Sequence, residues 1–428
     1  MRTLREGDWG ATVELLQWGL GRAGMNAAVD GIFGPQTAAT VKHWQEKSGL
    51  DANGVAGPRT WASLYPYLVG LRVHSVLEGD TFNSLAAAYG TTAEAIAVAN
   101  PLALPNRLTP GETLRIPIGV SAVPTNIRWS SDLLRHVVEG LRGRYPFLGV
   151  SVIGNSVLGR PLYQLTIGRG KPCVGYNAAH HANEWITTPV LLRFLEQYAY
   201  GVAFGGSVGG ADFRALYEHY TLDIVPMVNP DGVDLVTCAL AEDSDAYKQA
   251  GEIAASFPDI PFTSGWKANI EGTDINLSYP AGWETAKKLK YAQGFNRPAP
   301  RDYVGPRPLS APEAAAMAAR TKEAGYRLIL AYHTQGKIIY YQYRDYNPPG
   351  ANALGRRMEA VSGYVLERTP AYSGHAGYKD WFIQEWNRPG YTIECGKGVS
   401  PLPLSQFEEI YRDNFGILLL GMVGLDNA

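Results

Sequence analysis

A short apolar segment that ends in two histidines and a glutamate constrains the fold of this chain more than any other stretch. Residues 173–179 form a run typical of a buried strand, and residues 186–200 carry apolar side chains at helical spacing. His181 and Glu184 therefore lie at a turn between a strand and a helix. Imidazole nitrogens and carboxylate oxygens are both zinc ligands, and a catalytic zinc ion usually takes three protein ligands and a water molecule. We therefore expect a third ligand from elsewhere in the chain.

Two further apolar runs end in residues of the same kind. One run stops directly before His333, and another stops directly before Glu394. In open α/β sheets the functional side chains gather beyond the carboxyl ends of the strands. We therefore expect these two residues to meet His181 and Glu184 at one edge of a sheet. The alternative is that the histidines are buried polar groups that form hydrogen bonds within the core.

The length of the chain predicts two to four domains, because 428 residues exceed one ordinary domain. Residues 119–125 resemble a linker, and from residue 126 to 428 strand runs alternate with helical segments. This alternation predicts one parallel or mixed sheet that is covered by helices on both faces. At the start of a predicted helix, residues 312–323, Ser310 and Glu313 have the spacing of a capping box.

Residues 1–68 contain an internal repeat. The segment Asp30-Gly-Ile-Phe-Gly-Pro-Gln-Thr37 returns as Asn53-Gly-Val-Ala-Gly-Pro-Arg-Thr60. Each copy is a turn with glycine followed by a helical stretch, which predicts a small all-α domain of three helices. This segment resembles the peptidoglycan-binding helical domain of many cell-wall hydrolases. The alternative is a generic helical cap.

Residues 70–119 form a second small domain with the predicted order strand, helix, helix, strand, abbreviated βααβ. Asp80 or Thr81 can cap the first helix, and Thr92 can cap the second. With Gly79-Asp80-Thr81 and Asn100-Pro101 in place, the segment resembles a LysM domain. The resemblance implies binding of glycans that contain N-acetylglucosamine.

The order and placement of His181, Glu184, His333 and Glu394 resemble the zinc carboxypeptidase family over residues 126–428. The resemblance implies an α/β/α domain with a mixed eight-stranded sheet. It also implies that the two histidines and Glu184 hold one Zn²⁺ ion, with one position left for water. Glu394 would then act as the general base toward that water and would not bind the metal. His180 is the weaker candidate, because the family ligand lies three residues before the glutamate.

The resemblance assigns roles to five more residues. Lys267 stands where the family carries an arginine that stabilises the oxyanion, and Asp274 would accept a hydrogen bond from a ligating histidine. Asn276 and Tyr372 match substrate-binding positions, and Lys379 falls at the residue that sets the polarity of the specificity pocket. For the two lysines the alternative is a solvated surface position. For the tyrosine it is a packing or surface role.

Leu277 departs from the family pattern. Carboxypeptidases carry an arginine there that holds the terminal carboxylate of the substrate, and a leucine cannot pair with a carboxylate. Together with Trp266-Lys-Ala-Asn269 and His333-Thr-Gln-Gly336, the departure looks like the branch that cleaves γ-D-glutamyl–diaminopimelate bonds. The domain order also fits such enzymes in sporulating bacteria. The resemblance implies a zinc peptidase acting on peptidoglycan stem peptides, in which Lys379 would suit a carboxylate of diaminopimelate.

Three other functions stay open. The chain could be a carboxypeptidase that holds the terminal carboxylate with another residue, an inactive wall-binding protein, or a peptidoglycan amidase with an unrelated mechanism. Its formal charge of −2 gives no electrostatic sign of nucleic-acid binding. The sequence has no run of about 18 apolar residues, so we expect no transmembrane helix. Three cysteines argue against a disulfide framework.

The N-terminal segment lacks the apolar core of a secretory signal. We therefore expect the chain in the cytoplasm or in a developing spore rather than in a secreted, wall-bound location. The two wall-binding modules point the other way, and recycling of imported wall fragments would fit both observations.

Overall fold

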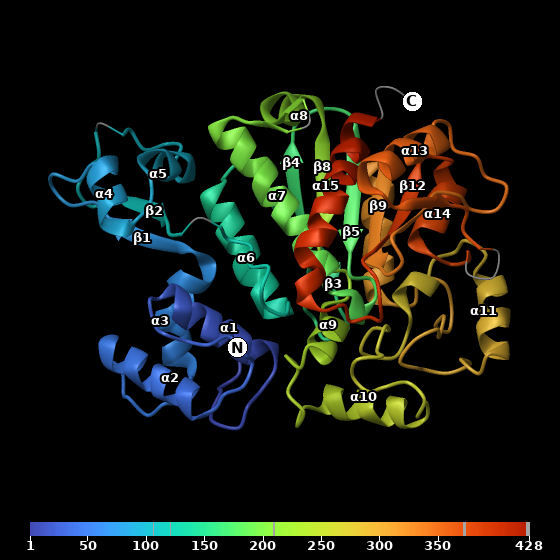
Figure 1. The fold of residues 1–428 in the computed structure, drawn as a ribbon, viewed down its shortest axis with the longest axis horizontal. Coiled ribbons are helices and arrows are strands. Elements are labelled where there is room, and N and C mark those ends of the chain that lie inside the picture. Colours follow the sequence, from blue (N-terminus) through green and yellow to red (C-terminus); the bar gives the residue numbers. More distant parts are fainter. Residues whose placement is uncertain (106, 120, 209, 371–373, 425–428) are drawn as a thin grey trace. The chain divides into compact units, whose positions relative to one another are not determined.

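The computed structural model describes residues 1–105, 107–119, 121–208, 210–370 and 374–424. They form two compact units, Met1–Gly149 and Val150–Ala428 (Figure 1). Within the described residues, no helix combines the length and the apolar character needed to cross a membrane.

The first unit begins with the predicted three helices, α1 (Ala11–Arg22), α2 (Pro35–Lys47) and α3 (Pro58–Val69). The internal repeat has a structural cause. Buried Gln17 donates from Nε2 to Thr37 Oγ1 at 3.0 Å, and Gln45 donates to Thr60 Oγ1 at 3.0 Å in the second copy. The side-chain oxygens of the two glutamines accept from the backbone of the glycine turns. Each copy thus repeats one hydrogen-bonded turn, and the expected three-helix domain is confirmed.

The βααβ domain is also present, and its elements are β1 (Leu71–Ser75), α4 (Phe82–Tyr89), α5 (Ala93–Ala99) and β2 (Thr113–Pro117). Thr81 caps α4 through a reciprocal capping box with Ser84, and Thr92 caps α5. Asn100 ties α5 to β2, because its side chain bonds the carbonyl and the amide of Arg115 at 2.7 and 2.8 Å.

A helix that the sequence analysis did not single out, α6 (Ser131–Arg144), completes the first unit. Its last residue, Arg144, is buried and donates to the carbonyls of Gly70, Ile118 and Gly119. These carbonyls lie at the two ends of the βααβ domain. The domain boundary at residue 126 stays a prediction from sequence, while the division into compact units falls after Gly149.

The second unit is built on a mixed eight-stranded sheet with the order β11-β10-β12-β9-β5-β8-β4-β3. The four central strands are parallel, and β10 and β4 pair antiparallel with their inner neighbours. The strands are β3 (Gly149–Asn155), β4 (Pro161–Gly168), β5 (Cys173–Ala178), β8 (Thr221–Val225), β9 (Leu328–Thr334), β10 (Ile338–Tyr340), β11 (Val365–Glu367) and β12 (Gly390–Cys395). The expected mixed sheet of eight strands is therefore confirmed.

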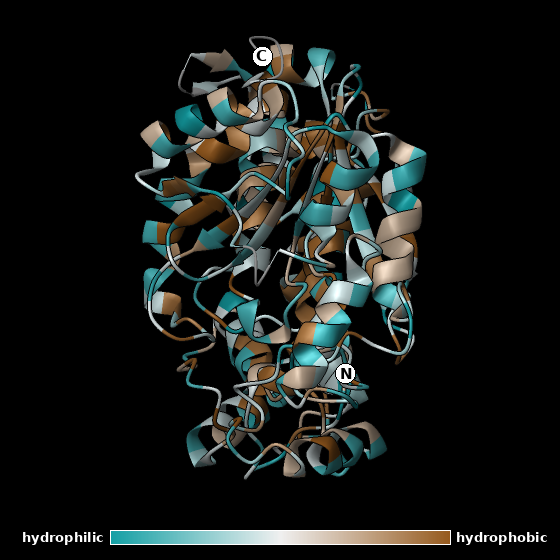
Figure 2. Cartoon of the chain, turned by 90° about the vertical axis from the view of Figure 1, so that its right-hand side faces the viewer, coloured by the Kyte–Doolittle hydropathy of each residue, from teal (hydrophilic) through white to brown (hydrophobic). Residues whose placement is uncertain are grey.

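Helices cover both faces of this sheet (Figure 1). On one face, Ile329 of β9 packs in a buried cluster with Met317 and Trp381. On the other face, Tyr176 of β5 donates to the carbonyl of Leu418 at 2.7 Å. The helices are α7 (Thr187–Phe204), α8 (Phe213–His219), α9 (Pro230–Val236), α10 (Asp245–Ala255), α11 (Trp283–Ala292), α12 (Pro312–Ala324), α13 (Ala351–Ser362), α14 (Tyr378–Trp386) and α15 (Phe407–Val423). Figure 2 shows apolar residues concentrated in the strands that these helices enclose.

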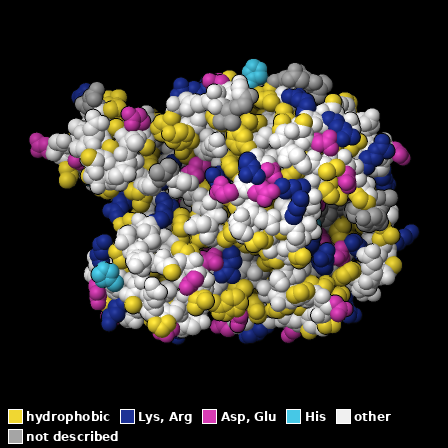
Figure 3. Space-filling view, viewed as in Figure 1, with side chains coloured by type: hydrophobic (Ala, Val, Ile, Leu, Met, Phe, Trp, Pro, Cys, Tyr) yellow, Lys and Arg dark blue, Asp and Glu magenta, His cyan; other side chains and the backbone are white. Residues whose placement is uncertain are grey.

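Charged side chains of both signs are interspersed over the face seen in Figure 3. This distribution accords with the nearly balanced composition of 38 cationic and 40 acidic residues.

The expected capping box at α12 is wrong. The helix begins one residue later than that box requires, with Ala311 as the N-cap and Pro312 in its first turn. Glu313 is fully buried instead, and it accepts hydrogen bonds from Asn269 Nδ2 and from the amide of Val157, both at 3.2 Å. Burial raises the pKa of Glu313 to about 7.

This buried carboxyl group makes stability depend on pH. The unfolded carboxyl ionises near pH 4.5 and the folded one near pH 7, so ionisation opposes folding increasingly as the pH rises through this range. Between pH 5 and pH 8, we expect the wild type to lose about 1–3 kcal/mol of its free energy of unfolding through this group. Glu313→Gln should not show that loss. Melting temperatures at the two pH values measure this, with the exposed Glu323→Gln on the same helix as the control. Parallel pH dependence in the wild type and in Glu313→Gln would contradict the assignment.

Candidate metal centre and active site

The first two candidate ligands are placed by a turn between β5 and α7. After β5, Ala179 adopts a left-handed backbone with φ of 52°, and a short 3₁₀ turn covers Ala182–Glu184. Thr187 closes the turn, since its hydroxyl accepts from the amide of Ala179 at 3.1 Å and donates to the carbonyl of Glu184 at 2.7 Å. The predicted strand–turn–helix arrangement is therefore present, and it turns His181 and Glu184 toward the same side.

The third candidate ligand comes from the neighbouring strand β9. His333 lies in β9 itself, one residue before its end, whereas the sequence analysis ended the strand at residue 332. His333 Nδ1 lies 2.9 Å from Glu184 Oε2 and 3.3 Å from His181 Nδ1, and His181 Nδ1 lies 2.9 Å from Glu184 Oε1. One ligand atom from each residue lies within 4.8 Å of the others. Residues 152 positions apart along the chain thus converge as expected.

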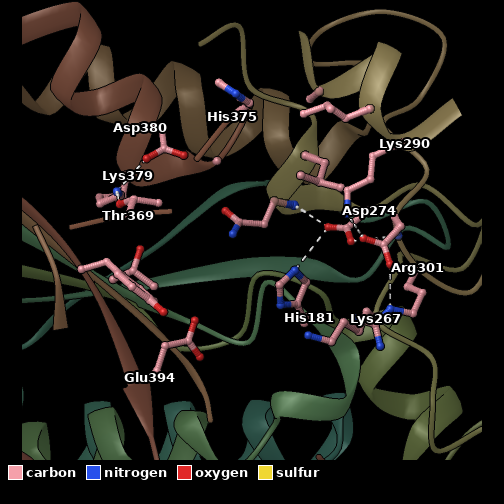
Figure 4. Close-up of a pocket in the computed structure, with 18 residues that line it drawn as sticks. His181, Lys267, Asp274, Lys290, Arg301, Thr369, His375, Lys379, Asp380 and Glu394 are labelled. Carbon is pink, nitrogen blue, oxygen red and sulfur yellow. Dashed lines mark hydrogen bonds and ion pairs between the residues drawn. The ribbon is translucent and has the colours of Figure 1, made fainter. Parts of the chain in front are cut away.

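These three side chains fit a metal ion. Two imidazoles and one carboxylate are a common ligand set of catalytic zinc, and together the three residues can hold one ion. Residues outside the ligand set also orient two of the ligands. Asp274 Oδ1 lies 3.3 Å from His181 Nε2, as expected, and the amide of Thr334 donates to Glu184 Oε2 at 3.2 Å. Figure 4 shows the contact between His181 and Asp274 at the floor of a pocket.

The charges in this cluster are arranged to bind a cation. Burial acts to lower the pKa of His181, but the carboxylates of Glu184 and Asp274 outweigh it and raise that pKa to about 9. Burial acts to raise the pKa of Glu184, yet the neighbouring His181 and Lys267 hold it well below its usual value. Binding of a metal ion by His181 would therefore release a proton.

Glu394 lies beside the cluster, in β12, one residue before the end of that strand. It pairs in register with His333 and lines the same pocket as His181 and Lys267. Burial, together with the nearby Glu184 carboxylate, raises the pKa of Glu394 to about 8. A bound divalent cation would offset the charge of Glu184 and lower that pKa.

Lys267 is not a solvated surface lysine. Its side chain is 19% exposed, and Nζ lies 2.9 Å from Glu184 Oε1. The backbone fixes this position from both sides, because the amide of Ala182 donates to the carbonyl of Lys267 and the amide of Lys267 donates to Pro300. The ammonium group is thus held next to the candidate ligands.

The pocket over this cluster has a volume of about 220 Å³. Figure 4 shows Lys290, Asp274 and Arg301 on one side of His181, and Thr369, Lys379 and Asp380 on the other side. Leu277 also lines the pocket and packs against the buried cluster around Trp283. The position that departs from the family pattern therefore gives the pocket an apolar wall.

The remaining predicted site residues differ in how the structure places them. Asn276 lines the pocket, and its side-chain oxygen accepts from the amide of Tyr378 at 3.0 Å, while its NH₂ group has no hydrogen-bond partner among the residues that the structure describes. Lys379 lines the pocket as well, but its side chain is only 4% exposed. Tyr372 lies outside the described residues. His180 contacts the hydroxyl of Tyr279 at 3.1 Å and is not one of the three clustered ligands.

The ammonium group of Lys379 is already paired with Asp380 and has two hydrogen-bond acceptors. Nζ lies 2.6 Å from Asp380 Oδ1, 2.8 Å from the carbonyl of Gln342 and 2.6 Å from Thr369 Oγ1. A substrate carboxylate would therefore compete with Asp380 for this ammonium group. The role of Lys379 toward a substrate therefore stays a prediction.

Sequence reasoning did not single out the charged residues on the far side of the pocket. Lys290, Arg301 and Asp302 lie on α11 and in the segment that follows it, where no strand end or motif marks them. Asp302 bridges the two cations, at 2.5 Å from Lys290 Nζ and 2.8 Å from Arg301 Nε.

Models of three protein families match the chain. Residues 134–416 match the zinc carboxypeptidase model. Residues 10–64 match the model of a peptidoglycan binding domain, and residues 74–117 match the LysM model. The two resemblances inferred for the N-terminal modules are thereby confirmed.

Individual proteins are similar to this chain over about two thirds of its length. The chain is 42% identical over 291 residues to gamma-D-glutamyl-L-diamino acid endopeptidase 1 of Lysinibacillus sphaericus, which covers 68% of this chain and 71% of that protein. It is 38% identical over 279 residues to the uncharacterised protein YqgT of Bacillus subtilis (strain 168), with 64% and 72% covered. The crystal structure of thrombin activatable fibrinolysis inhibitor shares the fold, with a TM-score of 0.56, 20% identity, and 71% and 79% of the two chains covered.

Proposed function

Because the chain belongs to the zinc carboxypeptidase family, it is a zinc metallopeptidase, and we propose that it hydrolyses the γ-D-glutamyl–meso-diaminopimelate bond of peptidoglycan stem peptides. The observation that carries the substrate class is the apolar wall at Leu277, where the family holds a terminal carboxylate with an arginine. The 42% identity to an enzyme named for cleaving γ-D-glutamyl-L-diamino acid bonds supports the same class.

The three clustered residues would hold the metal, with His181 and His333 as nitrogen ligands and Glu184 as the oxygen ligand. A zinc ion held there would polarise the scissile carbonyl and lower the pKa of a water molecule to about 7. Asp274 would keep His181 in the tautomer that presents Nδ1 to the metal, because Asp274 contacts Nε2 from the opposite side of the ring.

Glu394 would move the proton during hydrolysis. Its carboxylate takes a proton from the attacking water, whose oxygen bonds to the γ-carbonyl carbon of D-glutamate. The same proton then passes to the nitrogen of diaminopimelate as the carbon–nitrogen bond breaks. The products are a peptide with a free γ-carboxylate and a diamino acid, or a peptide that begins with one.

Lys267 would stabilise the negative charge that develops on the carbonyl oxygen. Its ammonium group pairs with Glu184. Binding of a metal ion by Glu184 would weaken that contact and leave a hydrogen of Lys267 for the oxyanion. Lysine keeps the charge of the family arginine but lacks its two-pronged geometry. Asn276 would donate from its NH₂ group to the substrate, and Tyr372, outside the described residues, is proposed as a further substrate contact.

The N-terminal modules would hold the enzyme on its substrate. The chain carries a peptidoglycan-binding domain and a LysM domain. We propose that they bind peptidoglycan, the LysM domain through glycans that contain N-acetylglucosamine. Tethering of this kind raises the concentration of stem peptides around the active site without a new contact at the pocket.

Mass spectrometry of a defined digest tests the proposed function. The zinc-loaded protein is incubated with the tetrapeptide L-Ala-γ-D-Glu-meso-diaminopimelate-D-Ala, free and linked to muramic acid. We expect L-Ala-γ-D-Glu together with the dipeptide meso-diaminopimelate-D-Ala. Release of D-Ala alone would indicate a carboxypeptidase, and release of muramic acid would indicate an amidase. No cleavage by a zinc-loaded sample would indicate a binding protein.

A further inference from the structure

The proposed substrate carries a carboxylate that ordinary peptides lack near the scissile bond. In a γ-D-glutamyl linkage the side-chain carboxyl forms the amide, so the α-carboxylate of D-glutamate stays free. It stands four carbon–carbon bonds from the scissile carbonyl carbon, roughly 5 Å when extended. A cation on the acyl side of the active site would pair with this carboxylate.

Glu394 identifies the acyl side. The leaving nitrogen must lie near the group that protonates it, so the diaminopimelate half of the substrate lies on the Glu394 side of the pocket. In Figure 4, Glu394 lies on the same side of His181 as Lys379 and Thr369, while Arg301 and Lys290 lie on the opposite side. The acyl half, with its α-carboxylate, then extends toward Arg301.

The backbone around Arg301 is fixed to the active site on both sides. The carbonyl of Pro300 accepts from the amides of Lys267 and Ala268, at 2.7 and 2.9 Å. The amide of Asp302 donates to Asp274 Oδ2 at 3.1 Å. Arg301 thus lies between a residue bonded to the proposed oxyanion lysine and a residue bonded to the carboxylate behind His181.

The guanidinium group of Arg301 uses one of its nitrogens, Nε, in a hydrogen bond within the described residues. Nε donates to Asp302 Oδ2 at 2.8 Å, and this contact sets the direction of the side chain. Among the described residues, the two terminal nitrogens have no hydrogen-bond partner, and the side chain is 40% exposed where it lines the pocket. The pair of terminal N–H groups matches the two oxygens of a carboxylate in a bidentate contact.

The other cations of the pocket are less suited to this role. Nζ of Lys290 pairs with Asp302, and Nζ of Lys379 pairs with Asp380 and donates to Gln342 and Thr369. Lys267 lies against Glu184, beside the reacting carbonyl. Arg301 lies close enough for its charge to act on Lys267, so the two cations share one end of the pocket.

We propose that Arg301 binds the α-carboxylate of the γ-D-glutamyl residue and thereby selects γ-D-glutamyl substrates with a free acid over those in which this group is a carboxamide. The inference rests on the proposed function. Because hydrogen bonds to charged groups contribute about 1.5–3 kcal/mol, the preference for the free acid should be roughly tenfold to a hundredfold in kcat/KM.

Two tripeptides test this directly. One is L-Ala-γ-D-Glu-meso-diaminopimelate, and the other carries a carboxamide in place of the α-carboxylate of D-glutamate. For the zinc-loaded wild type we expect kcat/KM to favour the free acid by about 10–100-fold. Arg301→Gln should lower kcat/KM on the free acid by the same factor and keep kcat/KM on the carboxamide within about threefold of wild type. The ratio of kcat/KM between the two tripeptides should then be near one. Arg301→Lys, which keeps the positive charge but not the bidentate geometry, should give an intermediate ratio of kcat/KM.

The control variant is Arg297→Gln, which removes the same charge four residues earlier. Arg297 is exposed, stacks on Phe257 at 5.6 Å and does not line the pocket. It should keep the wild-type ratio. Zinc content and melting temperature verify that each variant is folded, and the wild-type ratio on the two substrates stands even if Arg301→Gln fails to fold.

The outcomes separate the two hypotheses. If the wild type does not cleave the free-acid tripeptide, the proposed function is wrong. If it cleaves both tripeptides equally well, the function stands and the role of Arg301 is overturned. A third substrate, with a carboxamide in place of a carboxylate of diaminopimelate, tests whether Arg301 binds that carboxylate instead. If Arg301→Gln changes only the discrimination at that position, Arg301 contacts the amine half and the proposal is wrong.

Discussion

Glu394→Gln is expected to lower kcat by about 10²–10⁴-fold while the protein stays folded and binds zinc. General acid–base catalysis contributes an effect of this size, and an amide cannot accept the proton of the attacking water. Glutamine has nearly the same shape as glutamate, so the pairing of β12 with β9 beside His333 should persist. Because Glu394 is not one of the three clustered ligands, the zinc content should stay at one ion per chain.

Steady-state kinetics on the tripeptide, together with metal analysis, measure this result. The matched control is Glu385→Gln, an exposed position on α14 away from the pocket, which should retain wild-type kcat. A Glu394→Gln variant with more than a tenth of the wild-type kcat would exclude Glu394 as the general base. A variant that lost zinc would indicate that Glu394 acts as a ligand.

Local pattern indicated where the candidate ligands lie, and the family resemblance supplied their roles. His181 and Glu184 are three residues apart, so one turn places both. The ends of parallel strands indicated that His333 and Glu394 could lie at one edge of a sheet, and the family resemblance implied their roles; in the structure the two residues pair in register. What local pattern could not supply was the exact strand end, since His333 and Glu394 lie within their strands and not after them.

Contacts between distant loops set the features that the sequence did not predict. Arg301 reaches the pocket because residues near 300 pair with the backbone of Lys267 and Ala268, about thirty positions earlier and outside any strand. Lys379 is compatible with a surface position by sequence, yet acceptors from Gln342 and Thr369 bury its charge. The wrong capping box at Ser310 has a similar cause, because Glu313 contacts partners outside its own helix.

Removal of the metal with a chelator should abolish peptidase activity, by more than about 10³-fold, and leave a folded protein. Glu184 is buried and pairs with His181 and Lys267, so its charge should stay compensated when the metal is removed. The melting temperature should nevertheless fall by several degrees, since a ligand at 1,000 times its Kd stabilises the folded state by about 4 kcal/mol. One equivalent of Zn²⁺ per chain should restore both properties.

Ligand deletion gives the complementary test. His333→Ala should bind zinc at least about tenfold to a hundredfold more weakly and stay inactive at zinc concentrations that saturate the wild type, because only two ligands of the cluster remain. His219→Ala, an exposed histidine at the end of α8, is the control and should bind one zinc ion with full activity. Calorimetric titration with Zn²⁺ and metal analysis measure both variants. Undiminished activity in metal-free wild type, or wild-type zinc affinity in His333→Ala, would contradict a catalytic metal at this cluster.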